Sequence, residues 1–310
     1  MRAFAHDSFG EAGSIREVDL PQPSANEVRV KVVGASVNPV DWKTGKGYLK
    51  DYLEHRFPLI SGQDVSGVVD AVGAHVHDFK VGDDVFGFHG QAFMGRGTHA
   101  EYVIAASSAL APKPLAITGP EAASIPLAGV TAMMCVEAVQ AGPGDAVLIV
   151  GAAGGVGSFA VQLAAKRGAH VIGVARAVNH DYIRRLGATD AIDYEKGDLV
   201  AAVRAAHPEP LDAIIDLASD AETVRRLSAL LRDGGTVASP VGTAPMDDPR
   251  LKGAFVVAEF KRSRLEQLSS WLADGTLVLP EIRTYELDQV GDAFAKSEAG
   301  HVRGKLVITP

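Results

Sequence analysis

Cysteine is nearly missing from this chain, which has a single one, Cys135, in 310 residues. One thiol cannot form an intrachain disulfide, so we expect the protein in a reducing compartment. A lone cysteine also excludes zinc clusters that are built from several thiolates. The ten histidines do not stand at the spacings typical of metal ligands. The sequence therefore predicts no metal site.

Positive charge is also scarce, since 30 lysines and arginines face 38 acidic residues and leave a formal net charge of −8. Nucleic-acid binding depends on a basic excess that neutralises phosphates, so we expect no nucleic-acid partner. No apolar run approaches the roughly 18 residues that a membrane span requires. The first ten residues lack the basic and apolar regions of a signal peptide. We predict a cytoplasmic protein without a membrane partner.

The length of the chain fits two domains. Residues 1 to about 115 contain short apolar runs punctuated by glycine and proline, with a turn expected at Gly82–Asp84. The runs predict strands near 28–33, 64–73 and 99–105. Several short strands at this spacing are typical of a barrel or a sandwich.

From about residue 120, apolar runs of strand length alternate with stretches of helix length. Helices are expected at 119–142, 158–168, 181–187, 197–206, 221–234 and 263–274, and strands at 145–151, 170–175, 190–194, 211–217 and 235–242. This alternation predicts βαβ units and a doubly wound parallel sheet. The run at 254–260 could add an edge strand, and the end of the chain is again β-rich. We expect an α/β protein with a β domain at 1–117 and 276–310 and a dinucleotide-type domain at 118–275.

The strongest local signal is the glycine-rich segment Val150–Gly157, which follows an expected strand and opens an expected helix. Glycines allow a tight turn, and backbone N–H groups at the helix N-terminus can approach a pyrophosphate. The spacing is not the strict GxGxxG, which alone would be weak support. Its place at the head of the βαβ units favours a Rossmann dinucleotide site over a bare strand–helix turn. The residues expected at the cofactor are Gly151, Ala152, Gly154, Gly155, Val156 and Gly157.

The residues after the second strand of this domain indicate which dinucleotide binds. NAD sites usually carry an acidic residue about 20 positions after the glycines, for the ribose 2′-hydroxyl. Here no acid occurs before Asp181, and Arg176 occupies the region. Because a guanidinium pairs with a 2′-phosphate, NADPH is the predicted cofactor. Tyr194 could reach the same phosphate through its hydroxyl. The alternatives are a solvated arginine and a tyrosine that only packs.

Seven segments carry a family resemblance that covers nearly the whole chain. They are NPVDWKTGKG at 38–47, SGQDVSGVV at 61–69, VGDDVFGF at 81–88, GTHAEYV at 97–103, LAGVTA at 127–132, GAAGGVG at 151–157 and RGKLVI at 303–308. With them the chain resembles zinc-independent members of the medium-chain dehydrogenase/reductase superfamily, in particular quinone oxidoreductases and alkenal/enone reductases. The resemblance implies a GroES-like β-barrel domain, a Rossmann domain, NADPH and a homodimer.

Zinc-dependent members of this superfamily carry a catalytic cysteine where this sequence has Asn38, and a histidine where it has Gln63. They also have a four-cysteine lobe, for which this chain lacks the cysteines. Without zinc, another group must stabilise the oxygen that gains negative charge, and the amide of Asn38 can donate a hydrogen bond to it. The resemblance implies that Asn38 lies in the cleft beside the nicotinamide. The alternative is an asparagine that ends a strand before Pro39.

Three further residues of the same segment are catalytic candidates. Asp41 could orient the backbone or the Lys43 ammonium, or it could cap a helix. Lys43 could stabilise an enolate or donate a proton if its pKa is lowered, unless it is a plain surface lysine. Quinone reductases commonly have tyrosine at this position, whereas plant-type alkenal reductases resemble the NPVDWK form, which favours enones. Tyr48 is a weaker candidate acid.

The resemblance implies four more residues at the cofactor. Thr131 matches a family position near the nicotinamide and its phosphates, and Val241 and Gly242 would cover the nicotinamide face. Lys305 lies in the terminal segment that closes the cofactor cleft in the family. The loop at 87–97 is expected to control substrate access.

The sequence thus predicts an NADPH-dependent oxidoreductase that transfers hydride to a quinone or to the C=C bond of an α,β-unsaturated carbonyl. Two alternatives stay open: a zinc-free reductase of C=O bonds, and a non-catalytic, crystallin-like NADPH-binding protein. An exposed apolar edge strand at 254–260 would need to be covered. We therefore expect a homodimer that pairs through this strand.

Overall fold

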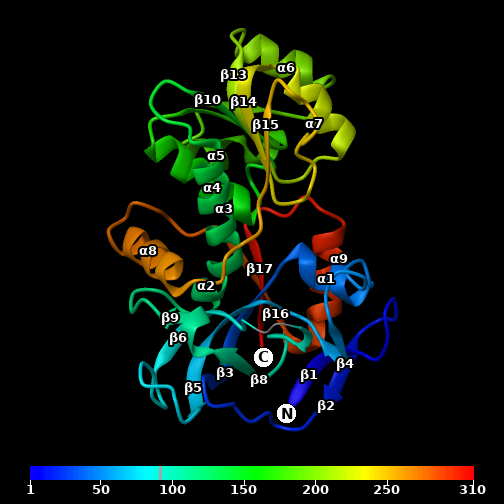
Figure 1. Cartoon of the computed structure of the whole chain (residues 1–310), viewed down its shortest axis with the longest axis vertical. Helices are drawn as coiled ribbons and strands as arrows, with labels where there is room; N and C mark the ends of the chain where they lie inside the picture. The colour runs from blue at the N-terminus through cyan, green and yellow to red at the C-terminus, as the bar shows by residue number, and fades with distance from the viewer. Residues whose placement is uncertain (91–92) are drawn as a thin grey trace. The chain divides into compact units, whose positions relative to one another are not determined.

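The computed structural model describes residues 1–90 and 93–310 and divides the chain into two compact units. The first unit combines both ends of the chain, Met1–Leu127 and Phe260–Pro310, and the second unit is Ala128–Glu259 (Figure 1). The C-terminal segment therefore returns to the N-terminal unit. Of the expected access loop at 87–97, residues 91–92 lie outside the described residues.

Strands dominate the first unit and form two sheets. The larger sheet has the order β16-β17-β3-β5-β6-β9, with β8 also paired to β3, and the smaller has the order β2-β1-β4-β7. The strands are β1 (Arg2–His6), β2 (Ser14–Glu17), β3 (Glu27–Val37), β4 (His55–Ile60), β5 (Asp64–Val72), β6 (Asp84–Phe88), β7 (Met94–Arg96), β8 (Tyr102–Ala106), β9 (Leu110–Pro112), β16 (Ile282–Glu286) and β17 (Lys305–Thr309). The helices of this unit are α1 (Pro39–Gly45), α2 (Gly119–Ala123), α8 (Arg262–Ala273) and α9 (Val290–Glu298), with 3-10 turns at Ser107–Ala109 and Leu287–Gln289.

Strand β3 organises the first unit because its apolar side chains alternate toward the core. Val28, Val30 and Val32 are buried, whereas the residues between them are partly or fully exposed, as a half-buried strand requires. The strand pairs antiparallel with β5 and β8 along its first part and with β17 along its last part. These pairings fix the position of the end of β3, from which the candidate site is built.

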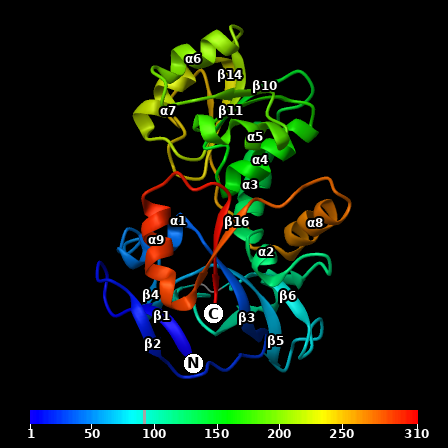
Figure 2. The same ribbon diagram turned by 180° about the vertical axis from the view of Figure 1, so that it is seen from behind.

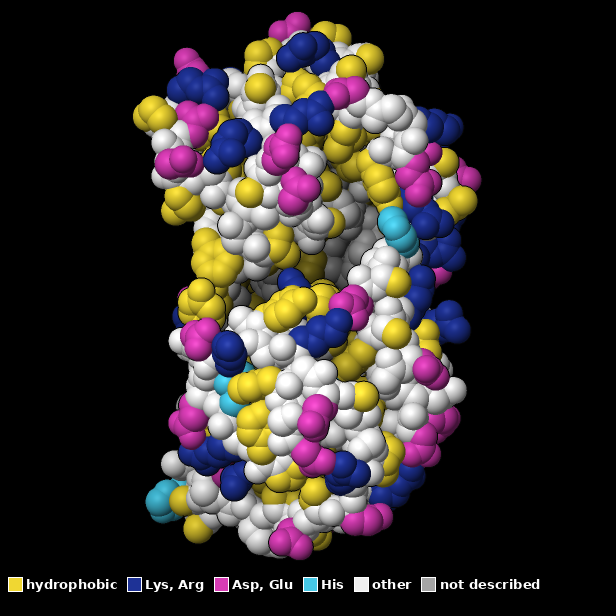
Figure 3. All heavy atoms as spheres, turned by 90° about the vertical axis from the view of Figure 1, so that its right-hand side faces the viewer, with side chains coloured by type: hydrophobic (Ala, Val, Ile, Leu, Met, Phe, Trp, Pro, Cys, Tyr) yellow, Lys and Arg dark blue, Asp and Glu magenta, His cyan; other side chains and the backbone are white. Residues whose placement is uncertain are grey.

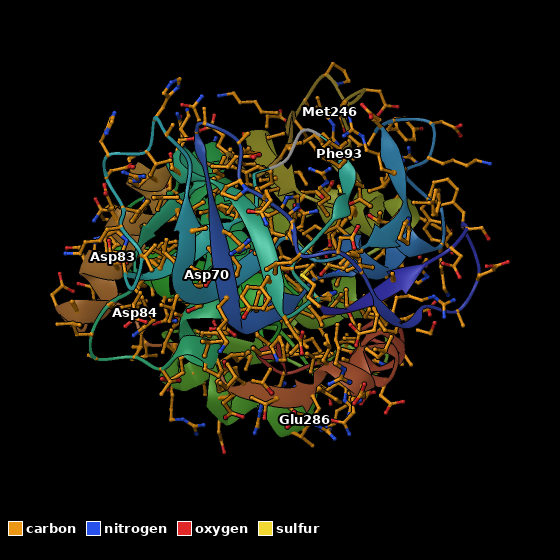
Figure 4. The ribbon with its side chains drawn as sticks, turned by 90° about the horizontal axis from the view of Figure 1, so that it is seen from below. Asp70, Asp83, Asp84, Phe93, Met246 and Glu286 are labelled. Carbon is orange, nitrogen blue, oxygen red and sulfur yellow. The ribbon has the colours of Figure 1, made fainter. Side chains whose placement is uncertain are left out.

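The predicted turn at Gly82–Asp84 leads into β6, whose first residue is Asp84, and Asp83 and Asp84 lie at the rim of this unit (Figure 4). Gly82 has a φ of +95°, which glycine adopts without strain. On the same sheet Asp70 of β5 accepts a hydrogen bond from Arg29 of β3 at 2.6 Å. This ion pair helps to hold the register of the two strands.

Six parallel strands form the sheet of the second unit, in the order β12-β11-β10-β13-β14-β15. This is the strand order of a doubly wound dinucleotide-binding sheet. Helices α4 and α5 lie on one face and α6 and α7 on the other (Figures 1 and 2). The strands are β10 (Ala146–Val150), β11 (His170–Val174), β12 (Asp190–Ile192), β13 (Leu211–Asp216), β14 (Leu231–Ser239) and β15 (Lys252–Phe255), and the helices are α3 (Pro126–Val139), α4 (Gly155–Lys166), α5 (His180–Arg185), α6 (Leu199–Ala206) and α7 (Ala221–Ser228), with a 3-10 turn at Ala177–Asn179.

Two predicted elements of this sheet are wrong in their bounds. The helix expected at 221–234 ends at Ser228, and its last residues belong to β14, which begins at Leu231 beside Leu211. Leu230 and Leu231 are buried, and pairing with β13 outweighs the helical pattern of the sequence. The edge strand expected at 254–260 is β15, which ends at Phe255. Residues 256–260 form no strand.

The predicted domain boundaries of 118 and 275 also differ from those of the compact units, because two helices pack in the first unit. Helix α2 lies against β3 so closely that a Cβ at Gly34 would stand 3.0 Å from the Cα of Pro120. Helix α8 is anchored by Arg262, whose guanidinium donates to the carbonyls of Leu110 and Ser107. The second unit is therefore shorter than expected at both ends.

Acidic and basic side chains are interspersed on the molecular face that Figure 3 displays. Among the described residues, none of the helices has both the length and the apolar character needed to cross a bilayer.

Candidate active site

Three buried polar residues meet where β3 ends. Asn38 directly follows β3 and precedes α1, whose first position is Pro39, a residue suited to that place because it lacks an N–H. Asp64 is the first residue of β5 and Lys305 the first of β17. The side chains of Asn38, Asp64 and Lys305 come together although each belongs to a different strand or turn. Their exposed fractions are 4%, 0% and 5%.

Hydrogen bonds hold the side-chain amide of Asn38 at both ends. Its Nδ2 donates to Oδ2 of Asp64 at 2.9 Å, and its Oδ1 accepts from Nζ of Lys305 at 2.7 Å. The Lys305 ammonium also donates to the carbonyl of Val37 at 2.9 Å and lies 4.0 Å from Oδ2 of Asp64. Buried charges persist only when they are paired and hydrogen-bonded, and this cluster meets both conditions.

The carboxylate of Asp64 is fixed by further donors. The Ser36 hydroxyl donates to its Oδ2, and the backbone N–H of Leu127 donates to its Oδ1 at 2.9 Å. Burial raises the pKa of Asp64, and Lys305 opposes that shift. Burial lowers the pKa of Lys305, and the carboxylates of Asp64 and Asp41 oppose that shift. The ionised form of each group is therefore stabilised by the charge of the other.

Asp41, the third residue of α1, is also buried, with an exposed fraction of 1%. Its Oδ2 accepts a hydrogen bond from the backbone N–H of Asn38 at 2.7 Å, so the helix-capping role weighed for this residue is realised. Burial, reinforced by Asp64, raises the pKa of Asp41 to about 8. Asp41 also borders a cavity of about 10 Å³, roughly the space of one water molecule.

Lys43 and Tyr48 both lie near the indole of Trp42. The ammonium of half-buried Lys43 is 5.6 Å from the indole centroid, and the Tyr48 ring is 6.2 Å from the indole in an edge-on arrangement. Tyr48 is 60% exposed. The structure thus brings Asn38, Asp41 and Lys305 together and groups Lys43 with Tyr48.

The residues near Asn38 do not suit a zinc ion. Zinc takes thiolate, imidazole or carboxylate ligands, whereas the positions compared with zinc ligands hold the amides of Asn38 and Gln63. Oδ1 of Asn38 already accepts from an ammonium, and Nε2 of Gln63 lies 3.3 Å from the sulfur of Met94. Within 1–90 and 93–310, His, Cys, Asp and Glu form no cluster of three that could hold a metal. Burial raises the pKa of Cys135 to about 12, so its thiol stays protonated.

The glycine-rich turn of the second unit joins β10 to α4. Gly151 has a φ of +80°, and Gly154 is the N-cap residue of α4. Ala152 and Gly154 donate backbone hydrogen bonds to Val174 and Gly151, while Gly155, Val156 and Gly157 form the first helical turn. A Cβ at Gly157 would stand 2.2 Å from the carbonyl oxygen of Gly151. The close turn and the open helix N-terminus suit the pyrophosphate of a dinucleotide.

Arg176 and Tyr194 both follow neighbouring strands of this sheet, β11 and β12. The Arg176 guanidinium lies 3.8 Å from the carboxylate of Glu195, and Tyr194 is 37% exposed. Partial burial and Glu195 raise the pKa of Tyr194, so its hydroxyl stays protonated and can donate. Glu195 therefore adds a negative charge next to Arg176.

The residues expected at the nicotinamide lie on α3 and after β14. Thr131 is a buried residue of α3. Val241 is 43% exposed, and Gly242 has a φ of +81°. Their loop is held by Thr243, whose hydroxyl donates to buried Asp216 at the end of β13 and contacts the Ser239 hydroxyl at 2.9 Å.

Sequence reasoning missed four residues of these sites: Ser36, Asp64, Glu195 and Asp216. A usable signal existed for two of them, because Asp64 opens and Asp216 ends a strand that is rich in apolar residues. A carboxylate at the border of a buried strand needs a partner. Lys305 was predicted at the cofactor, and in the structure its ammonium donates to Asn38 and to the carbonyl of Val37.

Comparisons with known proteins agree on one family. A model of the alcohol dehydrogenase GroES-like domain matches residues 24–115, and a zinc-binding dehydrogenase model matches residues 186–308. A quinone oxidoreductase of Triphysaria versicolor is 32% identical over 100% of this chain and 98% of its own length. An NADPH-dependent alkenal/one oxidoreductase of Arabidopsis thaliana is 30% identical over 100% of this chain and 80% of its own length.

A solved structure supports the same assignment. The quinone oxidoreductase of Coxiella burnetii is 32% identical, with a TM-score of 0.90 over 100% of this chain and 99% of that one. The chain therefore belongs to the medium-chain dehydrogenase/reductase superfamily, to its quinone oxidoreductase type. It is an oxidoreductase built from a GroES-like domain and a Rossmann-like parallel sheet. The predicted family, fold and enzyme class are confirmed.

Proposed function

We propose that this oxidoreductase uses NADPH to reduce a quinone or the C=C bond of an α,β-unsaturated carbonyl, without a metal. The observation that carries the proposal is the Asn38 amide, which is buried and held in place by Lys305 and Asp64. Relatives named for quinone and alkenal/one reduction support the substrate class. A nicotinamide dinucleotide is the cofactor that this family implies.

The reaction needs a hydride, a proton and a group that stabilises negative charge on oxygen. The nicotinamide supplies the hydride when NADPH is bound. The side-chain amide of Asn38 donates a hydrogen bond to the substrate oxygen as that oxygen gains charge. Solvent, or the half-buried Lys43, then delivers a proton to the enolate or hydroquinone anion, which balances the transferred hydride.

The choice of NADPH over NADH depends on Arg176. Its guanidinium can pair with a 2′-phosphate, and the Tyr194 hydroxyl can donate to the same group. The nearby Glu195 opposes this pairing but is exposed and can turn away. We expect Arg176→Ala to lower kcat/KM for NADPH about tenfold while leaving kcat/KM for NADH nearly unchanged. An equal loss with both cofactors would contradict the assignment.

The test is cofactor oxidation with a short enone, a 2-alkenal, a benzoquinone and a simple ketone, each with NADPH and with NADH. Turnover of enones or quinones supports the proposal, whereas turnover of the ketone alone favours a carbonyl reductase. NADPH binding seen as a higher melting temperature, without turnover of any substrate, favours a non-catalytic protein.

The variant Asn38→Asp keeps the size of the side chain and the bond from Lys305 but loses the amide donor. We expect it to lower kcat by about a hundredfold or more.

The cytoplasmic location stays a prediction. It rests on the single cysteine, which makes an intrachain disulfide impossible.

A further inference from the structure

We propose that Lys305 is a positioning residue, which fixes the orientation of the Asn38 amide and so keeps one of its N–H bonds available to the substrate oxygen. The inference rests on the proposed function, in which Asn38 donates to that oxygen. It assigns to Lys305 a role in catalysis that differs from cofactor binding.

The chemistry of the neighbours decides which way the amide points. A lysine ammonium has only donors, and an ionised carboxylate has only acceptors. Lys305 lies 2.7 Å from Oδ1 of Asn38, and Asp64 lies 2.9 Å from its Nδ2. An amide rotated by half a turn would direct its N–H groups at the ammonium and its oxygen at the carboxylate, so both bonds would be lost.

The amide carries two N–H bonds, and Asp64 accepts one of them. Within the described residues, Nδ2 of Asn38 has no other hydrogen-bond acceptor. The second N–H is therefore the donor that the proposed reaction requires. The charge on Lys305 also draws electron density toward Oδ1, which makes this N–H a stronger donor.

The backbone around Lys305 makes it a rigid support. Its Nζ donates to the carbonyl of Val37, the residue before Asn38, at 2.9 Å. Leu306, the next residue, pairs with Val37 in the sheet. Lys305 thus belongs to β17, which pairs directly with the end of β3, and Asn38 follows β3.

A simpler role would be that Lys305 only neutralises the buried charge of Asp64, from which it lies 4.0 Å. The two roles predict different results in a double-mutant cycle. If Lys305 only neutralises Asp64, Lys305→Met has no effect on kcat once Asp64→Asn has removed the charge. If Lys305 positions Asn38, the same substitution lowers kcat in both backgrounds.

The experiment compares the wild type, Lys305→Met, Asp64→Asn and the double variant by kcat, by KM for both substrates and by melting temperature. We expect Lys305→Met to lower kcat by about tenfold to a hundredfold in either background, with KM for NADPH changed less than about twofold. The melting temperature should fall in each single variant, because each leaves one buried charge without its partner, and it should fall less in the double variant, which contains neither charge. The rise in melting temperature on addition of NADPH should persist in all four proteins.

Equal kcat values for Asp64→Asn and the double variant would overturn the inference. If Lys305→Met does not fold, the kcat values of Asp64→Asn and of the double variant still test the inference, since neither protein contains the Asp64 carboxylate. A wild type that turns over none of the enones and quinones would refute the proposed function instead. The two failures are therefore distinguishable.

Discussion

At the scale of the residue, the chemistry of Asn38 depends on partners that are distant in sequence. Asp64 is 26 positions away and Lys305 is 267 positions away. The resemblance to a known family was enough to predict Asn38 as a candidate, because the motif around it is local. No local pattern in the sequence indicates which charged side chains contact this amide. The orientation of the amide is therefore known only from the structure, in which β3 pairs with β17.

The titration of Asp41 gives a prediction about stability. Its pKa is raised to about 8 in the folded protein, against about 4 in an unfolded chain. Between these values the folded state holds a proton that the unfolded state has released, so stability falls as the pH rises through this window. The free energy of unfolding falls by up to roughly 1.4 kcal/mol for each pH unit in this window, and the fall ends above about pH 8.

Asp41→Asn removes this titration and keeps an oxygen that can accept from the Asn38 N–H. We expect the variant and the wild type to be similarly stable near pH 4, and the variant to be the more stable of the two near pH 8. Urea unfolding of both proteins at a series of pH values measures the difference. Parallel curves across the series would show that Asp41 is ionised at neutral pH and would refute the prediction.

At the scale of the element, the turn from β10 into α4 was predictable because it is determined locally. Glycines between an apolar run and a helical stretch leave few other structures for that segment. The start of β14 was not predictable, because Leu230 and Leu231 fit the pattern of α7 as well as that of a strand. Their pairing and burial beside β13 decide between the two.

The glycines of this turn can be tested one against another. A methyl group at Gly157 would collide with the carbonyl oxygen of Gly151 at 2.2 Å, whereas one at Gly154 would make an ordinary contact at 3.4 Å. We expect Gly157→Ala to lower the free energy of unfolding by about 1–3 kcal/mol and to weaken NADPH binding at least about tenfold. Gly154→Ala should unfold like the wild type.

Urea unfolding and a fluorescence titration with NADPH measure both effects. Weaker binding by Gly154→Ala at unchanged stability would support a pyrophosphate that lies against this turn. Wild-type affinity in Gly157→Ala would mean that the turn does not contact the cofactor.

At the scale of the whole molecule, the predicted homodimer depends on the edge of the parallel sheet. Strand β15 is the last strand in the order; its last residue, Phe255, is 59% exposed, and Val257 just after it is 62% exposed. An apolar sheet edge of this kind favours pairing with a second copy. Because β15 ends at Phe255, we now expect the pairing at Lys252–Phe255 rather than along all of 254–260.

Light scattering at micromolar concentrations tests this assembly. We expect a dimer for the wild type and a monomer for Phe255→Asp, since a charge at the edge would be buried in the interface. Leu115→Asp is the matched control, because Leu115 is an apolar residue of the first unit with 96% exposure. A monomeric wild type would remove the prediction.

The sequence by itself determined the two-part α/β organisation, the dinucleotide turn and the candidate role of Asn38. These features are readable because they come from local patterns: apolar periodicity, glycines at a strand–helix junction and a short motif. The tertiary structure alone decided that Lys305 donates a hydrogen bond to Asn38, that Asp41 is buried with a raised pKa, and that Glu195 lies beside Arg176. The physical reason is that burial and charge pairing arise between segments that only the folded sheets bring together.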